Sequence, residues 1–225
     1  MTACIIPARS GSKRIKNKNI IEIEDEPIIA KAIKLAKKSK LFERIIVSTD
    51  SLKIAKISKK FGAEVPFLRS KKLSDDFTPT YKVLIDCIKK IKSYDHKYHV
   101  CIYPTAILIN KQDLKKAFEK IKSMKAEFIC PIQKFEINPL RSLKINGKFM
   151  NFAWSKFQMS RSQDLDELYY DTGSFYIYKT ESLLKINQKK IIPKKSTYIF
   201  LKKKLIDVNY PKDLKLLKEE IKNAR

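Results

Sequence analysis

The sequence predicts an α/β fold in which helices flank a mostly parallel β-sheet. Short apolar runs rich in β-branched residues alternate with stretches of helical periodicity through the first 130 residues, and this alternation is typical of β-α-β units. The chain has 225 residues, of which 44% are hydrophobic, enough to form one sizeable core. Ligands of such folds bind beyond the carboxyl ends of the strands, so we expect a functional site in the loops that follow them.

Five strands are expected in this part of the chain, over Thr2–Pro7, Arg44–Thr49, Val65–Leu68, Tyr98–Tyr103 and Glu127–Ile132. Amphipathic helices are expected between them, with apolar stripes that begin at Ile28, Ile54, Leu84 and Leu114. Pro27 suits the first turn of the first helix, and Gly62 suits the C-cap of the second. We interpret the stripes as core faces.

The regular alternation ends after Gln133. Residues 134–172 are irregular and rich in aromatic side chains, and Asn146-Gly147 lies between two short β-like runs, which is a hairpin signal. We interpret the segment as an arm inserted into a single domain of residues 1–225, and expect its aromatic residues to form a dimer contact. Beyond the arm we expect three more strands and two helices, at Ser174–Tyr178, Glu181–Lys185, Tyr198–Leu201, Lys204–Val208 and from Pro211 onward.

The charge of the chain is strongly positive. There are 49 Lys and Arg residues against 24 Asp and Glu residues, a net charge of +25, and only 7 of the cations are arginine. Such a charge suits a nucleic-acid partner, but readers of nucleic acid depend on arginine for bidentate contacts. Because the lysines are spread along the whole length, we interpret most of them as solvated surface that still attracts small polyanions such as nucleotides.

The residue inventory excludes several kinds of site. The four glycines cannot form a G-x-G-x-x-G or Walker A loop. The four cysteines form no C-x-x-C pair and suit buried free thiols in a reducing compartment, and no zinc site is expected from His96 and His99 alone. No apolar run approaches the roughly 20 residues of a membrane span, and the N-terminus has no secretory pattern. We therefore expect a cytoplasmic protein without membrane insertion.

The most informative segment follows the first strand. At Pro7 a buried strand runs into a loop with Gly11, two serines and five cations within residues 9–18. Glycine and serine let backbone N–H groups approach a phosphate closely, and arginine and lysine neutralise it. In a chain this rich in lysine, a solvated basic turn is the alternative.

The string from Ile5 to Asn19 resembles the N-terminal signature I-P-A-R-x-x-S-K-x-x-x-x-K-N of the sugar-nucleotide cytidylyltransferases that activate sialic acid and related nine-carbon keto-sugar acids. Further segments are similar to the same family, over Ile46–Asp50 and Gly62–Arg69. Leu73–Thr80, Arg161–Leu165 and Tyr170–Tyr176 resemble the branch that makes CMP-pseudaminic acid. The resemblance implies a Rossmann-like nucleotidyltransferase fold, similar to GT-A, and a homodimer.

The resemblance also implies a role for individual residues. CTP phosphates would be held by Arg9, Ser12, Lys13 and Lys18, of which the three cations would be catalytic. Asn19 would contact the nucleotide or its metal, and Arg69, Thr78 and Thr80 would contact cytosine and ribose. The sugar acid would meet Tyr103, Arg161, Gln163, Asp171 and Phe175. Asp75 and Asp76 are open to a second interpretation, as caps of the helix that starts near Thr80.

The family's metal motif is D-x-D-T-P-x-D, whose first two aspartates bind Mg²⁺. Asp207 matches the first of them, and Asn209 stands where the second aspartate is expected. An asparagine carbonyl is still a ligand for a hard cation, but without the charge. Asp213 suits the first turn of the last helix. We thus expect Mg²⁺ as the cofactor, with Asp207 and Asn209 as its ligands.

The implied reaction is attack by the anomeric hydroxyl of a nonulosonic acid on the α-phosphorus of CTP, with release of pyrophosphate. Tyr103-Pro104-Thr105 stands where sialic-acid enzymes resemble Q-P-T, which favours a pseudaminic substrate. N-acetylneuraminate, legionaminate or an eight-carbon keto-deoxy acid are alternatives. Two other classes stay open, a basic nucleic-acid-binding protein and a CTP-binding regulator that makes no product.

Overall fold

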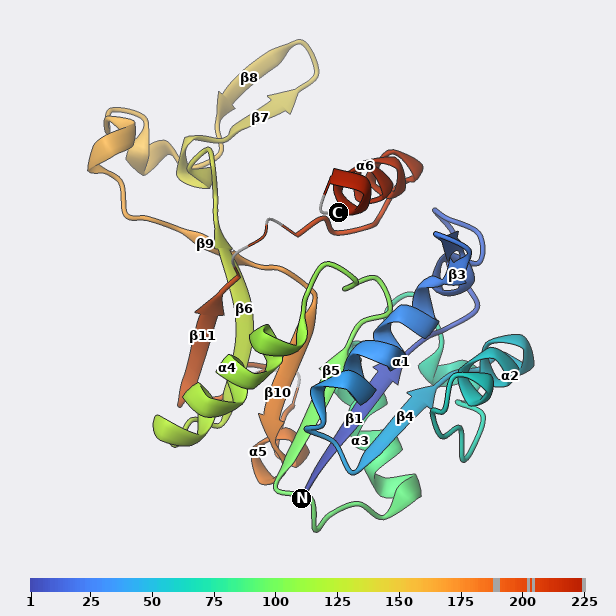
Figure 1. The fold of residues 1–225 in the computed structure, drawn as a ribbon. Coiled ribbons are helices and arrows are strands. Elements are labelled where there is room, and N and C mark those ends of the chain that lie inside the picture. Colours follow the sequence, from blue (N-terminus) through green and yellow to red (C-terminus); the bar gives the residue numbers. More distant parts are fainter. Residues whose placement is uncertain (188–190, 202, 204, 224–225) are drawn as a thin grey trace. The chain divides into compact units, whose positions relative to one another are not determined.

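The fold is that of a computed structural model, which describes residues 1–187, 191–201, 203 and 205–223 (Figure 1). The chain divides into two compact units. The larger comprises Met1–Pro131 and Thr172–Arg225, and the smaller comprises Ile132–Asp171. The smaller unit coincides closely with the segment 134–172 that the sequence sets apart as an arm.

The larger unit is built on a mixed sheet with the strand order β11-β6-β10-β5-β1-β4. Strand β1 (Thr2–Pro7) pairs in parallel with β4 (Arg44–Ser48) and with β5 (Tyr98–Ile102). Strand β10 (Phe175–Lys179) runs antiparallel between β5 and β6 (Phe128–Lys134), and β11 (Ser196–Phe200) lies beside β6. The predicted α/β fold with a mostly parallel sheet is confirmed.

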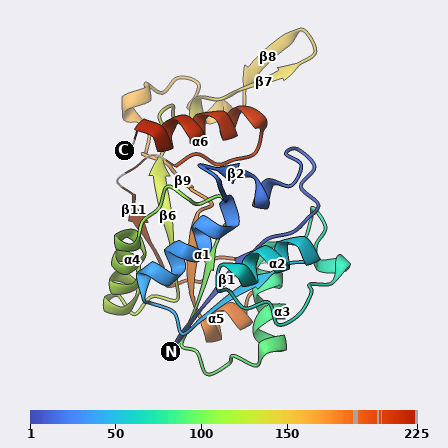
Figure 2. The ribbon, with the colours of Figure 1, turned by 45° about the vertical axis from the view of Figure 1, so that its right-hand side comes forward.

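Helices cover both faces of this sheet (Figures 1 and 2). The apolar stripes of α1 (Ile28–Ser39), α2 (Leu52–Lys60) and α4 (Lys111–Ser123) share one core cluster with Cys4 and Ile6 of β1. Helices α3 (Thr80–Ile91) and α5 (Thr180–Leu184) share a second cluster with Ala3 and Ile5. Alternate residues of β1 therefore fill opposite faces, as the period of a strand requires.

The last helix, α6 (Pro211–Asn223), begins at Pro211 as predicted. Its Leu217 is fully buried in a third cluster with Val208 and with Ile15 of the loop after β1. Asp213 accepts hydrogen bonds from the backbone N–H groups of Asn209 and Tyr210 at 2.9 and 2.7 Å, which confirms its place in the first turn. Packing thus joins the C-terminal helix to the N-terminal loop.

Helix α2 ends as the sequence predicts. Gly62 has a φ of +88°, its N–H donates to the carbonyl of Lys59, and the N–H of Ala63 donates to the carbonyl of Ser58. These two bonds form a Schellman motif. An added Cβ at Gly62 would lie 2.5 Å from Nζ of Lys37.

The structure differs from the predictions in three segments. Residues 65–68 form only an isolated bridge between Thr49 and Leu68 instead of a strand. Leu205–Val208 is irregular, while Lys204 lies outside the described residues. A short hairpin of β2 (Glu22–Ile23) and β3 (Glu26–Pro27) was not predicted, because its turn residues Glu24 and Asp25 take positive φ values without the Asn or Gly that marks such turns.

The smaller unit pairs β9 (Tyr169–Asp171) with the second half of β6. It also contains a hairpin of β7 (Leu143–Asn146) and β8 (Phe149–Phe152). The turn places a positive φ of 61° at Gly147, so the predicted hairpin is confirmed. Several apolar side chains of this unit are exposed, at Ile137, Ile145, Phe149, Met150, Trp154 and Met159.

In the described part of the chain, no helix combines the length and the apolar character that crossing a membrane requires. The four cysteines are free thiols, and three of them are buried.

One buried polar cluster surrounds His99. His99 of β5 is fully buried, its Nδ1 lies 2.8 Å from Oγ1 of Thr180, and its Nε2 lies 2.9 Å from Oγ of Ser93. Since Oγ1 of Thr180 donates to the carbonyl of His96, it accepts from Nδ1–H of His99, and Ser93 then donates to Nε2. Burial, with a smaller contribution from His96, lowers the pKa of His99 to about 4, so the ring is neutral when folded.

We expect this histidine to make the free energy of unfolding fall as the pH drops from about 6.5 toward 4. The unfolded chain binds the proton near pH 6.5 and the folded chain only near 4, so acid favours unfolding by up to about 3 kcal/mol. Urea unfolding of the wild type at pH 7.5 and 4.5 measures the change. In His99→Gln the difference between the two pH values should shrink by most of that amount, and an unchanged difference would contradict the assignment.

Candidate active site

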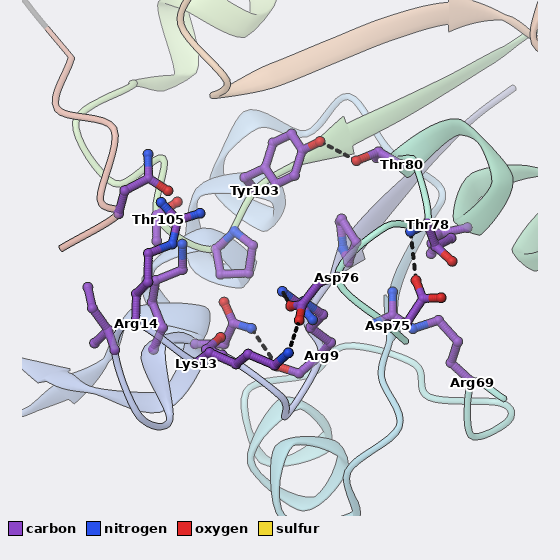
Figure 3. Close-up of a pocket in the computed structure, with 18 of the residues that line it drawn as sticks. Arg9, Lys13, Arg14, Arg69, Asp75, Asp76, Thr78, Thr80, Tyr103 and Thr105 are labelled. Carbon is purple, nitrogen blue, oxygen red and sulfur yellow. Dashed lines mark hydrogen bonds and ion pairs between the residues drawn. The ribbon is translucent and has the colours of Figure 1, made fainter. Parts of the chain in front are cut away.

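A cavity of about 220 Å³ opens in the larger unit beyond the carboxyl ends of β1 and β5. It is lined by the loop after β1, the segment before α3, the residues after β5, and one residue near α6. Figure 3 shows its side chains. The lining contains ten residues that the sequence singled out, namely Arg9, Ser12, Lys13, Lys18, Asn19, Arg69, Thr78, Thr80, Tyr103 and Asn209. Residues as distant as 9 and 209 are thus brought together.

Hydrogen bonds to Asp50 and from Asn19 fix the loop after β1. Asp50, just after β4, accepts from the backbone N–H of Ser10 at 2.8 Å and from its hydroxyl at 2.7 Å. The amide of the buried Asn19 donates to the carbonyl of Arg9 at 2.9 Å. In this arrangement Asn19 lines the cavity and also fixes the backbone of Arg9, another residue of the lining.

Two cations of this loop converge on one carboxylate. Nη2 of Arg9 lies 2.6 Å from Oδ1 of Asp76, and Nζ of Lys13 lies 2.7 Å from Oδ2. These two partners, Lys13 first, hold the pKa of Asp76 below its usual range, so Asp76 is an anion at neutral pH. The cavity therefore places an anion between the two residues that were predicted to hold phosphate.

Neither Asp75 nor Asp76 caps α3, so that interpretation is wrong. The residue before the helix is Pro79, and no side chain caps it. Asp75 instead closes a turn by accepting from the N–H groups of Phe77 and Thr78 at 3.1 and 2.6 Å. The turn orients Asp76 toward the cavity, where it meets Lys13 (Figure 3).

Arg69 is the most deeply buried cation of the cavity, with 5% of its surface exposed. Its Nε donates to Oγ of Ser74 at 3.0 Å, but its buried Nη2 has no hydrogen-bond partner among the described residues. Burial lowers the pKa of Arg69, and the nearby Asp50 acts in the opposite direction. A buried N–H group without a partner is costly, so this nitrogen is suited to an acceptor that a ligand supplies.

Hydroxyl groups line another side of the cavity. The hydroxyl of Tyr103 forms a short hydrogen bond with that of Thr80 (Figure 3), and its ring packs edge-on against Tyr176 at 5.7 Å between centroids. Oγ1 of Thr78 donates to the carbonyl of Lys72 at 3.2 Å. Tyr103 thus connects the predicted ribose contact to residues of β10.

The C-terminal segment brings the predicted metal ligands close to Lys18. Nζ of Lys18 donates to the carbonyl of Val208 at 2.8 Å, and Nδ2 of Asn209 donates to Oδ2 of Asp207 at 2.5 Å. Burial lowers the pKa of Lys18, while Asp207 acts to raise it. Asn209 lines the main cavity, and Asp207 lines a small neighbouring one with Thr105.

The structure places the other predicted residues elsewhere. Phe175 is fully buried in the core of the larger unit, where it cannot touch a solute, so we assign it to packing and not to the sugar site. Arg161, Gln163 and Asp171 belong to the smaller unit, where Arg161 pairs with Asp164 at 2.6 Å.

The cavity lining also includes polar residues that the sequence did not assign to the site, among them Asp76, Thr105 and Arg14. Asp76 lies between two cations, Thr105 lies just beyond β5, and the guanidinium of Arg14 lies 5.2 Å from the ring centre of Tyr210. Arg14 follows Lys13 directly, but the signature has no fixed residue at that position. For Arg14, adjacency to the motif was the one signal in the sequence, whereas Asp76 and Thr105 lie within segments that resemble the family.

Comparison with known proteins agrees with this geometry. The family model described as cytidylyltransferase matches residues 3–223. The chain belongs to the cytidylyltransferase family. It is 36% identical over 220 residues to the pseudaminic acid cytidylyltransferase of Campylobacter jejuni strain 81-176, covering 96% of this chain and 94% of the relative. It is 31% identical over 199 residues to the CMP-N,N'-diacetyllegionaminic acid synthase of Legionella pneumophila, covering 86% and 81%.

Solved structures support the fold. A CMP:2-keto-3-deoxy-manno-octonic acid synthetase, complexed with CTP, aligns with a TM-score of 0.74 over 100% of this chain and 99% of its own, at 13% identity. A cytidylyltransferase from Leptospira borgpetersenii aligns with a TM-score of 0.65 at 18% identity, over 99% of this chain and 87% of its own. The predicted Rossmann-like nucleotidyltransferase fold is therefore confirmed for this cytidylyltransferase.

Proposed function

We propose that this cytidylyltransferase transfers CMP from CTP to the anomeric hydroxyl of pseudaminic acid, a nonulosonic acid. The observation that carries the proposal is the gathering of Arg9, Lys13, Lys18 and Arg69 around one cavity, in a chain 36% identical to enzymes with that name. In the reaction the hydroxyl oxygen forms a bond to the α-phosphorus and gives up its proton. The bond from that phosphorus to the β-phosphate oxygen breaks, and pyrophosphate leaves.

The protein's part in this reaction is alignment and charge neutralisation. Arg9 and Lys13 would bind the phosphates with bidentate and point-charge contacts, and Lys18 would support them from the side of α6. Such groups act by stabilising the charge that develops on the phosphate oxygens in the transition state. Asp50 and Asn19 fix the backbone of the loop at Ser10 and Arg9, so that little reorganisation of this backbone is needed.

The buried, unpaired Nη2 of Arg69 supports cytosine as the base. Cytosine offers its O2 and N3 as acceptors, and an acceptor at this nitrogen would satisfy a donor that otherwise stays unpaired. Thr78 and Thr80 would contact the ribose hydroxyls, since their own hydroxyls line the same cavity. Tyr103, bonded to Thr80, would separate the nucleotide from the sugar acid.

Mg²⁺ fits the donors near α6 as a weakly held ion. Asp207 offers one carboxylate and Asn209 one amide oxygen, and no group of three His, Cys, Asp or Glu side chains suited to a metal occurs within the described residues. Since Mg²⁺ commonly takes one or two carboxylates, substrate phosphates and water, these two residues would hold it together with CTP. When bound, the ion would neutralise phosphate charge.

Replacing Asn209 with aspartate should raise the apparent affinity for Mg²⁺, by about three- to tenfold, because it adds a second charged ligand. The concentration of Mg²⁺ that gives half-maximal turnover at saturating CTP measures this. Asp207→Asn should move the same value in the opposite direction. An unchanged Mg²⁺ titration in both variants would contradict the metal assignment.

We further propose that the enzyme is a homodimer and that the smaller unit forms the contact. Its hairpin exposes Ile145 by 80% and Phe149 by 78%, and exposed apolar groups of this kind mark an interface. Arg161 and Gln163 of the same unit would then serve the sugar site of a second copy, together with Asp171.

The free cysteines support a reducing, cytoplasmic location.

Replacing Ile145 and Phe149 together with glutamate should convert the dimer to a monomer, because two charges would be buried at the contact. Sedimentation velocity measures the change. Lys144→Glu on the same hairpin is the matched control for added charge. A wild type that sediments as a monomer at micromolar concentration would contradict the dimer.

Pyrophosphate release with CTP and a panel of sugar acids tests the function. Pseudaminic acid should give the highest kcat/KM, above N-acetylneuraminate, legionaminate and an eight-carbon keto-deoxy acid. A different best sugar would keep the reaction and change the specificity. CTP binding without turnover on any sugar would favour a regulator, and salt-sensitive RNA or DNA affinity without turnover would favour a nucleic-acid-binding protein.

A further inference from the structure

Asp76 occupies the place where the proposed function puts phosphate. Each oxygen of its carboxylate meets a different cation, Oδ1 that of Arg9 at 2.6 Å and Oδ2 that of Lys13 at 2.7 Å. A carboxylate with two engaged oxygens resembles one edge of a phosphate in charge and spacing. The two cations that the proposed function assigns to the phosphates, Arg9 and Lys13, are therefore already paired with an anion in the free protein.

The loop that carries Asp76 is built to keep it there. Asp75 fixes the turn that follows, through the N–H groups of Phe77 and Thr78. Ser74 donates its hydroxyl to the carbonyl of Ser70 at 2.9 Å and accepts from Nε of Arg69. Asp76 does not cap α3, and 28% of its side-chain surface is exposed. It can thus leave the cations without breaking the turn.

We propose that Asp76 is a positioning residue that stands in for phosphate. It orients Arg9 and Lys13 in the free enzyme, releases them when the triphosphate of CTP binds, and takes them back as pyrophosphate leaves. This inference rests on the proposed function.

The physical reason is competition for the same donors. The carboxylate and a phosphate cannot both lie within hydrogen-bond distance of the same N–H groups, and two anions held side by side repel each other. The exchange lowers the affinity for CTP and for pyrophosphate alike. In return, the cations need no reorientation when CTP arrives, and the product is released more readily.

Asp76→Asn tests this inference, since asparagine has the same shape without the charge. Inorganic pyrophosphate and tripolyphosphate, titrated by calorimetry in the presence of EDTA, should bind about five- to tenfold more tightly than to the wild type, as expected for the loss of two partly exposed competing ion pairs. In turnover, KM for CTP should fall, kcat should fall with it, and inhibition by pyrophosphate should become stronger.

Glu119→Gln is the matched control, because it makes the same change in net charge on the exposed face of α4. If Asp76 competes with phosphate for Arg9 and Lys13, the gain in pyrophosphate affinity from Asp76→Asn should disappear when both cations are replaced by alanine. If the gain came only from the change in net charge, it would persist in that background. By NMR, the pKa of the Asp76 carboxyl should rise when tripolyphosphate saturates the wild type. A residue with a purely structural role would show neither change.

The inference is overturned if Asp76→Asn binds pyrophosphate no more tightly than Glu119→Gln does, or if its gain survives the loss of both cations. Failure of the proposed function would look different, since the wild type would then neither bind CTP nor release pyrophosphate with any sugar acid. Normal wild-type turnover together with an unaffected Asp76→Asn would sink this inference alone.

Discussion

Replacing Arg9 or Lys13 with alanine is expected to lower the kcat/KM of CMP-sugar formation by about a hundredfold to a thousandfold. Both side chains line the cavity and would stabilise negative charge on the phosphates. This stabilisation would be stronger in the transition state than in the bound substrate, so its loss lowers the rate. The fold should survive, because Lys13 is 82% exposed and Arg9 is 32% exposed. Turnover with CTP and pseudaminic acid measures the loss, and circular dichroism checks the fold.

Lys16→Ala is the matched control for this experiment. It removes one cation from the same loop, but Lys16 is exposed and does not line the cavity. Its activity should stay within about twofold of the wild type, as expected for loss of a screened surface charge. Near-normal turnover in Arg9→Ala or Lys13→Ala would remove the phosphate-binding assignment of that residue.

Replacing Arg69 with methionine should have the second-largest effect, a loss of about a hundredfold in kcat/KM for CTP. A site that pairs a buried donor with the substrate discriminates strongly, because the wrong base leaves that donor unpaired. The variant should therefore lose much of its preference for CTP over UTP as well. Stability should change little, since an aliphatic chain of similar length replaces a buried cation whose Nη2 has no hydrogen-bond partner in the part of the chain that the structure describes.

Two further variants sharpen the test on the base. Arg69→Lys keeps the charge but not the planar fork of donors, so most of the loss should remain. Arg44→Met makes the same change at the start of β4, where Arg44 pairs with Glu64 at 2.6 Å outside the cavity, and should leave the preference for CTP intact. Unchanged selectivity in Arg69→Met would show that this side chain does not contact cytosine.

The elements that the sequence predicted well are those with strong local signals. The stripes of α1 and α4 and the apolar run of β1 repeat with the period of their own element, and Gly62 marks the end of α2 by its permissive backbone. The hairpin β2–β3 was missed because its turn has no such residue. Residues 65–68 have strand-forming side chains, but they form only one isolated β-bridge, between Leu68 and Thr49. Whether such a segment forms a full strand depends on the backbone that lies beside it in the folded protein.

The residues of the candidate site also divide into those that the sequence could assign and those that depend on the tertiary structure. The signature from Arg9 to Asn19 is contiguous, so its resemblance to the cytidylyltransferase family could be recognised in the sequence, and that resemblance implied phosphate binding. The ion-pair partner of Arg9 and Lys13 could not be predicted from the sequence. Asp76 lies more than 60 positions from both residues, and its place before α3 suggested a helix cap. Phe175 was placed at the sugar site by its motif, whereas its burial depends on the antiparallel pairing of β10 with β5.

The net charge of +25, the basic composition of the loop after β1 and the asparagine at position 209 are properties of the sequence alone. The tertiary structure decided which charges act together. Folding places Lys18 beside the carbonyl of Val208, 190 positions later, and buries Nη2 of Arg69 where no described residue accepts its hydrogen bonds. Electrostatic and hydrogen-bond energies depend on separation in space, and only the packed sheet and its loops fix that separation.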